Sequence, residues 1–308
     1  ILPEDAAAKD DLLNLPNVQI FSIKKSLLYF HLLTRFIFKR DYKNHFEDSK
    51  WIFIHNSKLI NFFNQYSFKL GMINHSGKLR NTLHRAFNIF LTHAGYERFI
   101  SHYPDNESTN IVIPHGFEQL SESFGLKKNK ILKVISAGRF VSKKGFNDLI
   151  KAAEKLQRDN FPVQIELFGS GPLEAELSKK INDLALKNIR LIGWTEDLHN
   201  EFRKADVFCI TSLEEPFGLI IGEAMMSGLP VISTQTDGAI EIFGTEPEKK
   251  GAIYVDFSSP DEIKNAIQAL INDEKRLLLA QNAHDNINTN FSLERLSRKL
   301  KDLFEYAD

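Results

Sequence analysis

The sequence FCITSLEEPFGLIIGEAMMSGLPVIST occupies residues 208–234 and reads as a strand, a loop, a helix, a turn and a second strand. The loop at 211–216 is polar and ends in two carboxylates and a proline. Apolar residues at helical spacing over 217–227 predict a helix packed on a sheet, and Gly228 and Pro230 end it. Similar strand and helix patterns alternate along the chain, which predicts an α/β fold with parallel sheets.

The start of this helix suits an anionic ligand that is rich in hydroxyl groups. The backbone N–H groups near Phe217, Gly218 and Leu219 have no partner within the helix and can donate to phosphate or sugar oxygens. Glu215 and Glu223 stand eight residues apart, where both could accept hydrogen bonds from sugar hydroxyls. From the residues alone, the two glutamates serve equally well as solvated carboxylates beside a helix start.

A second candidate site follows the strand predicted at 132–137. Gly138 and Arg139 end this strand, and Lys144 precedes the helix predicted at 146–158. Two cations around one strand-to-helix turn can clamp a diphosphate leaving group. The alternative is a pair of exposed cations in a loop.

Other strand ends carry glycine or aromatic residues. Gly169 and Gly171 form a GxG turn that lacks the third glycine of a dinucleotide fingerprint, because Glu174 stands in its place. Trp194 and His75 each follow a predicted strand, and parallel sheets bind ligands beyond their carboxyl ends. Trp194 serves equally well in packing, and a lone histidine in such a position is more often structural.

The stretch from Glu215 to Glu223, followed by AMMSGLPV at 224–231, resembles the E-x7-E signature of retaining glycosyltransferases of family 4. The chain is similar to the bacterial sugar transferases of lipopolysaccharide and capsule synthesis. This resemblance implies the GT-B fold, in which two Rossmann-like α/β domains face each other across a cleft. It covers residues 131–290 strongly and residues 1–128 only in outline.

The resemblance also implies roles for single residues. Glu215 lies near the donor sugar, Glu223 holds the ribose, and His75 contacts the donor sugar near the scissile bond. Arg139 and Lys144 stabilise the diphosphate. The remaining residues implied at the nucleotide-sugar site are Gly138, Gly169, Gly171, Trp194, Phe217, Gly218 and Leu219, with Gly238 as a further candidate near the donor.

The chain of 308 residues is long enough for two domains of about 150 residues each. We expect an acceptor-side domain over 1–128, a nucleotide-sugar domain over 129–290, and a helix over 291–308 that crosses back. Their charges differ, because residues 1–128 carry net +4 and the rest −5. The first strand and the glycine-rich loop of the family are missing, so we expect a natural chain that begins earlier; the alternative is a member without that loop.

Residues 24–40 combine an apolar, aromatic run with lysines and arginines at both ends. One interpretation is a buried helix of the N-terminal sheet. The other is a surface helix whose Lys24, Lys25, Lys39 and Arg40 meet anionic lipid headgroups. The second interpretation predicts peripheral membrane contact.

The composition limits which partners and which cellular compartment we expect. Net charge is −1, which gives no reason to expect a nucleic-acid partner. Cys209 is the single cysteine, so no disulfide can form within the chain, and we expect a cytoplasmic protein, at the inner face of the cell membrane if residues 24–40 bind lipid.

The resemblance to family 4 implies an enzyme that moves a sugar from a UDP- or GDP-sugar to a glycan or lipid-linked acceptor, with the anomeric configuration retained. The chain has no Asp-x-Asp pair, so we expect no metal ion and no other cofactor. Two alternatives remain open. One is another GT-B enzyme, such as a sugar-nucleotide epimerase or a phosphorylase, and the other is a binding protein that kept the fold without catalysis.

Overall fold

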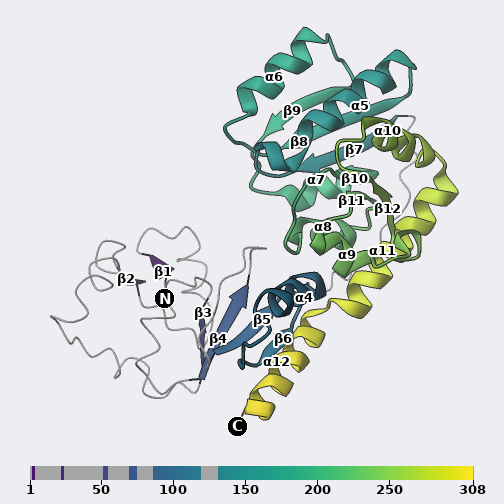
Figure 1. The fold of residues 1–308 in the computed structure, drawn as a ribbon. Helices are drawn as coiled ribbons and strands as arrows, with labels where there is room; N and C mark the ends of the chain where they lie inside the picture. Colours follow the sequence, from purple (N-terminus) through teal and green to yellow (C-terminus); the bar gives the residue numbers. More distant parts are fainter. Residues whose placement is uncertain are drawn as a thin grey trace. The chain divides into compact units, whose positions relative to one another are not determined.

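The computed structural model describes residues 2–3, 22–23, 51–54, 69–74, 86–118 and 131–307 (Figure 1). The chain divides into two compact units, residues 1–71 and 72–308. The segment at 24–40, residues 119–128 of the predicted acceptor-side domain, and His75 lie outside the described residues. The predicted domain boundaries, and the cleft between the domains, stay predictions.

The described residues before residue 131 include short strands and the helix α4. In the first unit, β1 pairs in parallel with β2. In the second unit, β5 pairs in parallel with β6. The bounds are β1 (Leu2–Pro3), β2 (Ser22–Ile23), β3 (Trp51–Ile54), β4 (Lys69–Asn74), β5 (Ala86–Phe90), α4 (His93–His102) and β6 (Asn110–Val112).

A six-stranded parallel sheet forms the centre of the second unit, in the order β12-β11-β10-β7-β8-β9. The chain builds outward from β7 through β8 and β9, and then returns to the other side of β7 for β10, β11 and β12. The sheet therefore has a switch point between β7 and β10. The strands are β7 (Leu132–Ala137), β8 (Val163–Phe168), β9 (Ile189–Gly193), β10 (Val207–Ile210), β11 (Val231–Thr234) and β12 (Ala252–Val255).

Helices connect these strands, as parallel pairing requires. Three more helices follow the last strand, and α12 ends the described chain (Figure 1). The helices are η3 (Ser142–Lys144), α5 (Phe146–Arg158), α6 (Glu174–Asp183), α7 (Leu198–Lys204), α8 (Leu219–Met226), α9 (Asp237–Phe243), η4 (Pro247–Lys250), α10 (Pro260–Ala269), α11 (Asp273–Asn290) and α12 (Leu293–Ala307).

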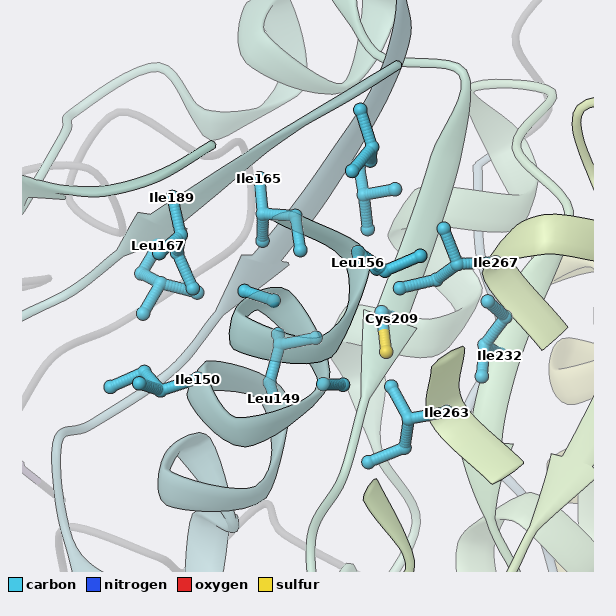
Figure 2. Packing of buried hydrophobic residues seen from close by; sticks show 14 of the residues in the cluster. Leu149, Ile150, Leu156, Ile165, Leu167, Ile189, Cys209, Ile232, Ile263 and Ile267 are labelled. Carbon is cyan, nitrogen blue, oxygen red and sulfur yellow. The ribbon is translucent and has the colours of Figure 1, made fainter. Parts of the chain in front are cut away.

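The sheet separates two hydrophobic cores, because side chains alternate along each strand. On β10, Val207 and Cys209 join the core that Leu149 of α5 and Ile263 of α10 also enter (Figure 2). Phe208 belongs to the other core, together with side chains of α7, α8 and α9. Both faces of the sheet are therefore covered, and functional groups are left to the loops at its ends.

Cys209 is fully buried in the first core. Burial raises the pKa of its thiol to about 12, so the thiol stays protonated and unreactive at neutral pH. Among the helices in the described part of the chain, none is long and apolar enough to cross a bilayer.

The predicted elements of the second half agree closely with the structure. The predicted bounds of the strand at 132–137 and of the helix at 146–158 are confirmed, and the strand predicted at the start of the 208–234 stretch is β10 (Val207–Ile210). The helix predicted from residue 217 is shorter, because it begins at Leu219. Gly218 has a φ of 78°, a left-handed conformation that sets Phe217 outside the helix.

Candidate functional site

The loops after β7 and β10 carry the charged residues that the sequence singled out. These two strands are neighbours at the switch point of the sheet. In open α/β sheets, ligands bind outside the carboxyl ends of the strands at such a point. Arg139 and Lys144 follow β7, and Glu215 follows β10. The topology therefore brings the predicted diphosphate clamp close to the carboxylate that is predicted to accept hydrogen bonds from the donor sugar.

Lys144 and Glu215 form an ion pair across the switch point. The Lys144 ammonium binds Oε1 of Glu215, and the Ser212 hydroxyl donates to the same oxygen at 3.1 Å. The side chains of Lys144 and Glu215 are 18% and 10% exposed. One carboxylate oxygen is therefore held by two donors of the protein, and within the described part of the chain the other oxygen, Oε2, accepts no hydrogen bond from the protein.

Main-chain contacts fix the two loops against each other. The Leu213 N–H donates to the Lys143 carbonyl at 2.8 Å, and the Thr211 hydroxyl donates to the Lys144 carbonyl at 3.2 Å. Gly145 makes this approach possible, because a Cβ at this position would lie 2.0 Å from the Thr211 carbonyl oxygen. Its φ of 68° also favours glycine. The two loops that carry the ion pair are thus held together through their main chains.

A cavity of about 540 Å³ opens at the ends of β7, β8 and β9. Lys144 and Glu215 are not among the described residues that line it, but Lys144 lies against the lining at Gly138, where an added Cβ would be 3.6 Å from Lys144 Cε. Gly169 lets the loops after β7 and β8 meet, since a Cβ there would lie 2.0 Å from the Gly138 carbonyl oxygen. The exposed Arg139 side chain also belongs to the cavity lining. Predicted site residues that line it are Gly138, Arg139, Gly169, Gly171 and Trp194, and the lining also includes Ile220 of α8.

Trp194 is 69% exposed at this cavity. The alternative interpretation of Trp194 as a packed core residue is therefore wrong. An indole on the cavity wall offers a flat apolar face to an aromatic ring, such as a nucleobase.

The start of α8 lies close to Glu215, but its residues differ in exposure. The Leu219 side chain is 47% exposed, whereas the Phe217 ring is buried and packs near His115 and Phe291. Only the main chain of Phe217 is therefore placed to serve a ligand. This restricts the predicted role of Phe217 to its backbone.

Glu223 lies one turn further along α8, at the surface of the helix. Partial burial of its carboxyl group raises its pKa, while the charge of nearby His199 lowers it. A raised pKa means that this carboxylate takes up a proton at a higher pH than an ordinary glutamate does.

Sequence reasoning missed Ser212 and underrated Gly238. Ser212 is fully buried and orients the Glu215 carboxylate. The Gly238 N–H donates to the Glu215 carbonyl at 2.9 Å, and a Cβ at Gly238 would lie 2.1 Å from the Phe217 carbonyl oxygen. The residue types gave only a weak signal, because a serine after a buried strand and a glycine in a turn are common.

The part of the chain that contains this site is similar in sequence to known proteins. Residues 117–286 match the family described as "Glycosyl transferases group 1", which is more than half of the chain. The chain therefore belongs to the group 1 glycosyltransferase family, and the family predicted from the sequence is confirmed.

Among curated relatives, the chain is 32% identical over 166 residues to the lipopolysaccharide core biosynthesis glycosyltransferase LpsE of Rhizobium meliloti, covering 53% of this chain and 47% of LpsE. It is 27% identical over 240 residues to the D-inositol 3-phosphate glycosyltransferase of Corynebacterium kroppenstedtii, covering 70% and 52%. The chain spans about half the length of the curated relatives it matches.

Solved structures show the same fold. HepE of Anabaena in complex with UDP superposes with a TM-score of 0.75 at 19% identity, covering 94% of this chain and 86% of HepE. A TarM variant of S. aureus in complex with fondaparinux, α-GlcNAc-glycerol and UDP gives a TM-score of 0.67 at 21% identity, covering 78% and 52%. The predicted α/β fold of the GT-B class is confirmed.

The ion pair predicts a difference between two neighbouring lysines. In Lys144→Met, the mostly buried Glu215 carboxylate loses its cation, and we expect the free energy of unfolding to fall by about 1–3 kcal/mol. Lys143→Met is the matched control, because Lys143 lies 3.9 Å from Glu214 in a pair that is 52% and 69% exposed. We expect this control to change stability by less than about 0.5 kcal/mol.

Urea denaturation followed by circular dichroism measures both effects. Adding Glu215→Gln to Lys144→Met removes the unpaired charge, so this double variant should regain part of the lost stability. Equal effects of the two lysine variants would contradict the geometry described for the switch point.

Proposed function

We propose that this protein transfers a sugar from a nucleotide-diphosphate sugar to an acceptor hydroxyl in the synthesis of cell-surface glycan or glycolipid. The observation that carries the proposal is the position of Arg139, Lys144 and Glu215 at the switch point, beside a glycine-lined cavity. Family membership supports the reaction class. LpsE and LpsD are named for lipopolysaccharide core biosynthesis, which supports a cell-surface product.

In this proposal the donor is a UDP- or GDP-sugar. HepE and TarM have been crystallised with UDP, and this favours uridine. The nucleobase stacks on Trp194, and the diphosphate lies along the main chain of Gly138, Gly169 and Gly171. Glu223 accepts hydrogen bonds from the ribose.

The reaction breaks the bond between the anomeric carbon and the diphosphate oxygen, and it forms a bond from that carbon to the acceptor oxygen on the same face. The acceptor proton passes to the leaving diphosphate. Arg139, Lys144 and the N–H groups near Gly218 and Leu219 stabilise the negative charge that develops. No metal ion or other cofactor takes part, since the cations of the chain fill that role.

Glu215 and His75 act on the sugar in this proposal. The free oxygen of the Glu215 carboxylate accepts from donor hydroxyls, while its other oxygen stays held by Lys144 and Ser212. His75 keeps the role that the family resemblance implies, at the donor sugar near the scissile bond. Retention of the anomeric configuration rests on the same resemblance.

The transferase proposal predicts that Arg139 and Lys144 matter for turnover. Replacing either residue by alanine removes one cation from the developing charge, and we expect a loss of about 3 kcal/mol in transition-state stabilisation, or about 150-fold in kcat/KM. Lys143→Ala is the matched control, because this exposed neighbour points to Glu214. Release of UDP from a panel of UDP-sugars, measured with candidate acceptors, gives the rates.

The product separates the alternatives. A labelled nucleotide sugar that changes its sugar without any acceptor indicates an epimerase, and release that requires inorganic phosphate indicates a phosphorylase. Binding of the nucleotide without turnover under all these conditions indicates a binding protein. Near-normal turnover in both alanine variants would contradict the diphosphate clamp.

We further propose that the protein works at the cytoplasmic face of the cell membrane, where residues 24–40 contact anionic lipid and the acceptor is lipid-linked. These residues lie outside the described part of the chain, so their composition and the net +4 of residues 1–128 support the proposal. Each lysine or arginine near an anionic surface contributes about 1 kcal/mol of attraction.

Vesicle co-sedimentation tests this contact. Wild type should sediment with anionic vesicles at low salt and not with neutral ones, and salt should weaken the binding. Changing Lys24, Lys25, Lys39 and Arg40 to glutamine should abolish sedimentation. A control changes four exposed cations of the second half, namely Lys179, Lys249, Arg298 and Lys301. Equal loss in both variants, or no sedimentation of wild type, would contradict the proposal.

A further inference from the structure

Helix α4 holds helix α9 through two carboxylates that lie one turn apart on α9. Arg98 of α4 donates both terminal nitrogens to Asp237, with Nη1 at 2.8 Å from Oδ1 and Nη2 bound to Oδ2. The backbone N–H of His93, at the first position of α4, donates to Oε2 of Glu241 at 2.8 Å. The His93 ring contacts the same carboxylate.

The contact at Asp237 is connected to Glu215 through the next residue of α9. Asp237 is the first residue of α9, and the next residue is Gly238. The Gly238 N–H donates to the carbonyl of Glu215 at 2.9 Å, and Gly238 also touches the Phe217 carbonyl so closely that no Cβ would fit. Any shift of the start of α9 must therefore move the main chain on both sides of Pro216.

The Arg98–Asp237 pair is a poor device for stability alone. The two side chains are 42% and 28% exposed, and pairs of this kind contribute about 0–1 kcal/mol to folding. Its geometry is more specific than its energy, because two parallel hydrogen bonds fix both the distance and the direction of the carboxylate. The hydrogen bond to Asp237 also raises the pKa of Arg98.

We propose that Arg98 is a positioning residue for the donor site: through Asp237 and Gly238 it fixes the main chain that carries Glu215. The N-terminal half of the chain thereby contributes to the placement of a sugar-binding carboxylate that belongs to the other half. The catalytic consequence rests on the proposed function, whereas the mechanical connection does not.

Hydrogen–deuterium exchange tests the connection without any ligand. In Arg98→Gln, the amide of Gly238 should exchange at least about tenfold faster, because its hydrogen bond to Glu215 opens more often. Peptides from the sheet core should keep their wild-type rates. Arg298→Gln is the matched control, since it removes one exposed guanidinium that bonds Glu294 within α12 at 3.0 Å.

Kinetics test the consequence. In Arg98→Gln, kcat/KM for the nucleotide sugar should fall about tenfold, because small misplacement of a positioned group is costly. Affinity for UDP alone should stay within about twofold of wild type, since Glu215 is assigned to the sugar. Arg98→Lys keeps the charge but not the paired geometry, and it should fall between wild type and Arg98→Gln.

The outcomes are distinct. If Gly238 exchange and kcat/KM in Arg98→Gln match those of the Arg298→Gln control, the inference is wrong. It is also wrong if exchange rises uniformly across the chain together with a fall in melting temperature, because that pattern indicates a purely structural pair. If exchange rises at Gly238 while wild type transfers no sugar from any donor, the proposed function fails and the positioning role stands.

Discussion

The contact between Lys144 and Glu215 is the interaction on which the account of this site depends. It exists because β7 and β10 are neighbours in the sheet although 69 residues separate the end of one from the start of the other. Because the two strands are parallel, the loops that follow them begin side by side at the same edge of the sheet. A cation and a carboxylate meet there with Ser212 as a third partner, and they are mostly shielded from water.

Each of the two charged groups affects both its partner and the ligand that we propose for the site. Glu215 and Lys144 neutralise each other's charge, and each offsets part of the cost of burying the other. In the proposed function, an arriving diphosphate competes with Glu215 for Lys144, so the pair would set the electrostatic balance of the site. In the same proposal, the glycines of the cavity lining let phosphate oxygens approach the main chain, which leaves the side chains for recognition of the sugar.

Much of the second half was readable from the sequence, and the reasons are physical. The strands at 132–137 and 207–210 are short apolar runs bounded by glycine or polar residues, which is typical of strands buried on both faces. The start of α8 was misplaced by two residues, because apolar spacing does not report the left-handed backbone of Gly218. The sequence alone could not show that Lys144 contacts Glu215 or that Arg98 contacts Asp237. Contacts between residues far apart in the sequence depend on the order of the strands in the sheet, which the sequence pattern does not give.

The central claim is that the cavity beside the Lys144–Glu215 pair binds a nucleoside diphosphate through the protein's own groups. Calorimetric titration with UDP and GDP in the presence of EDTA tests this most directly, with Trp194→Ala as a variant of an exposed lining residue. The account predicts saturable binding of one nucleotide per chain without a divalent cation, and weaker binding in the variant. Absence of binding, or binding that appears only when a divalent cation is restored, would contradict it.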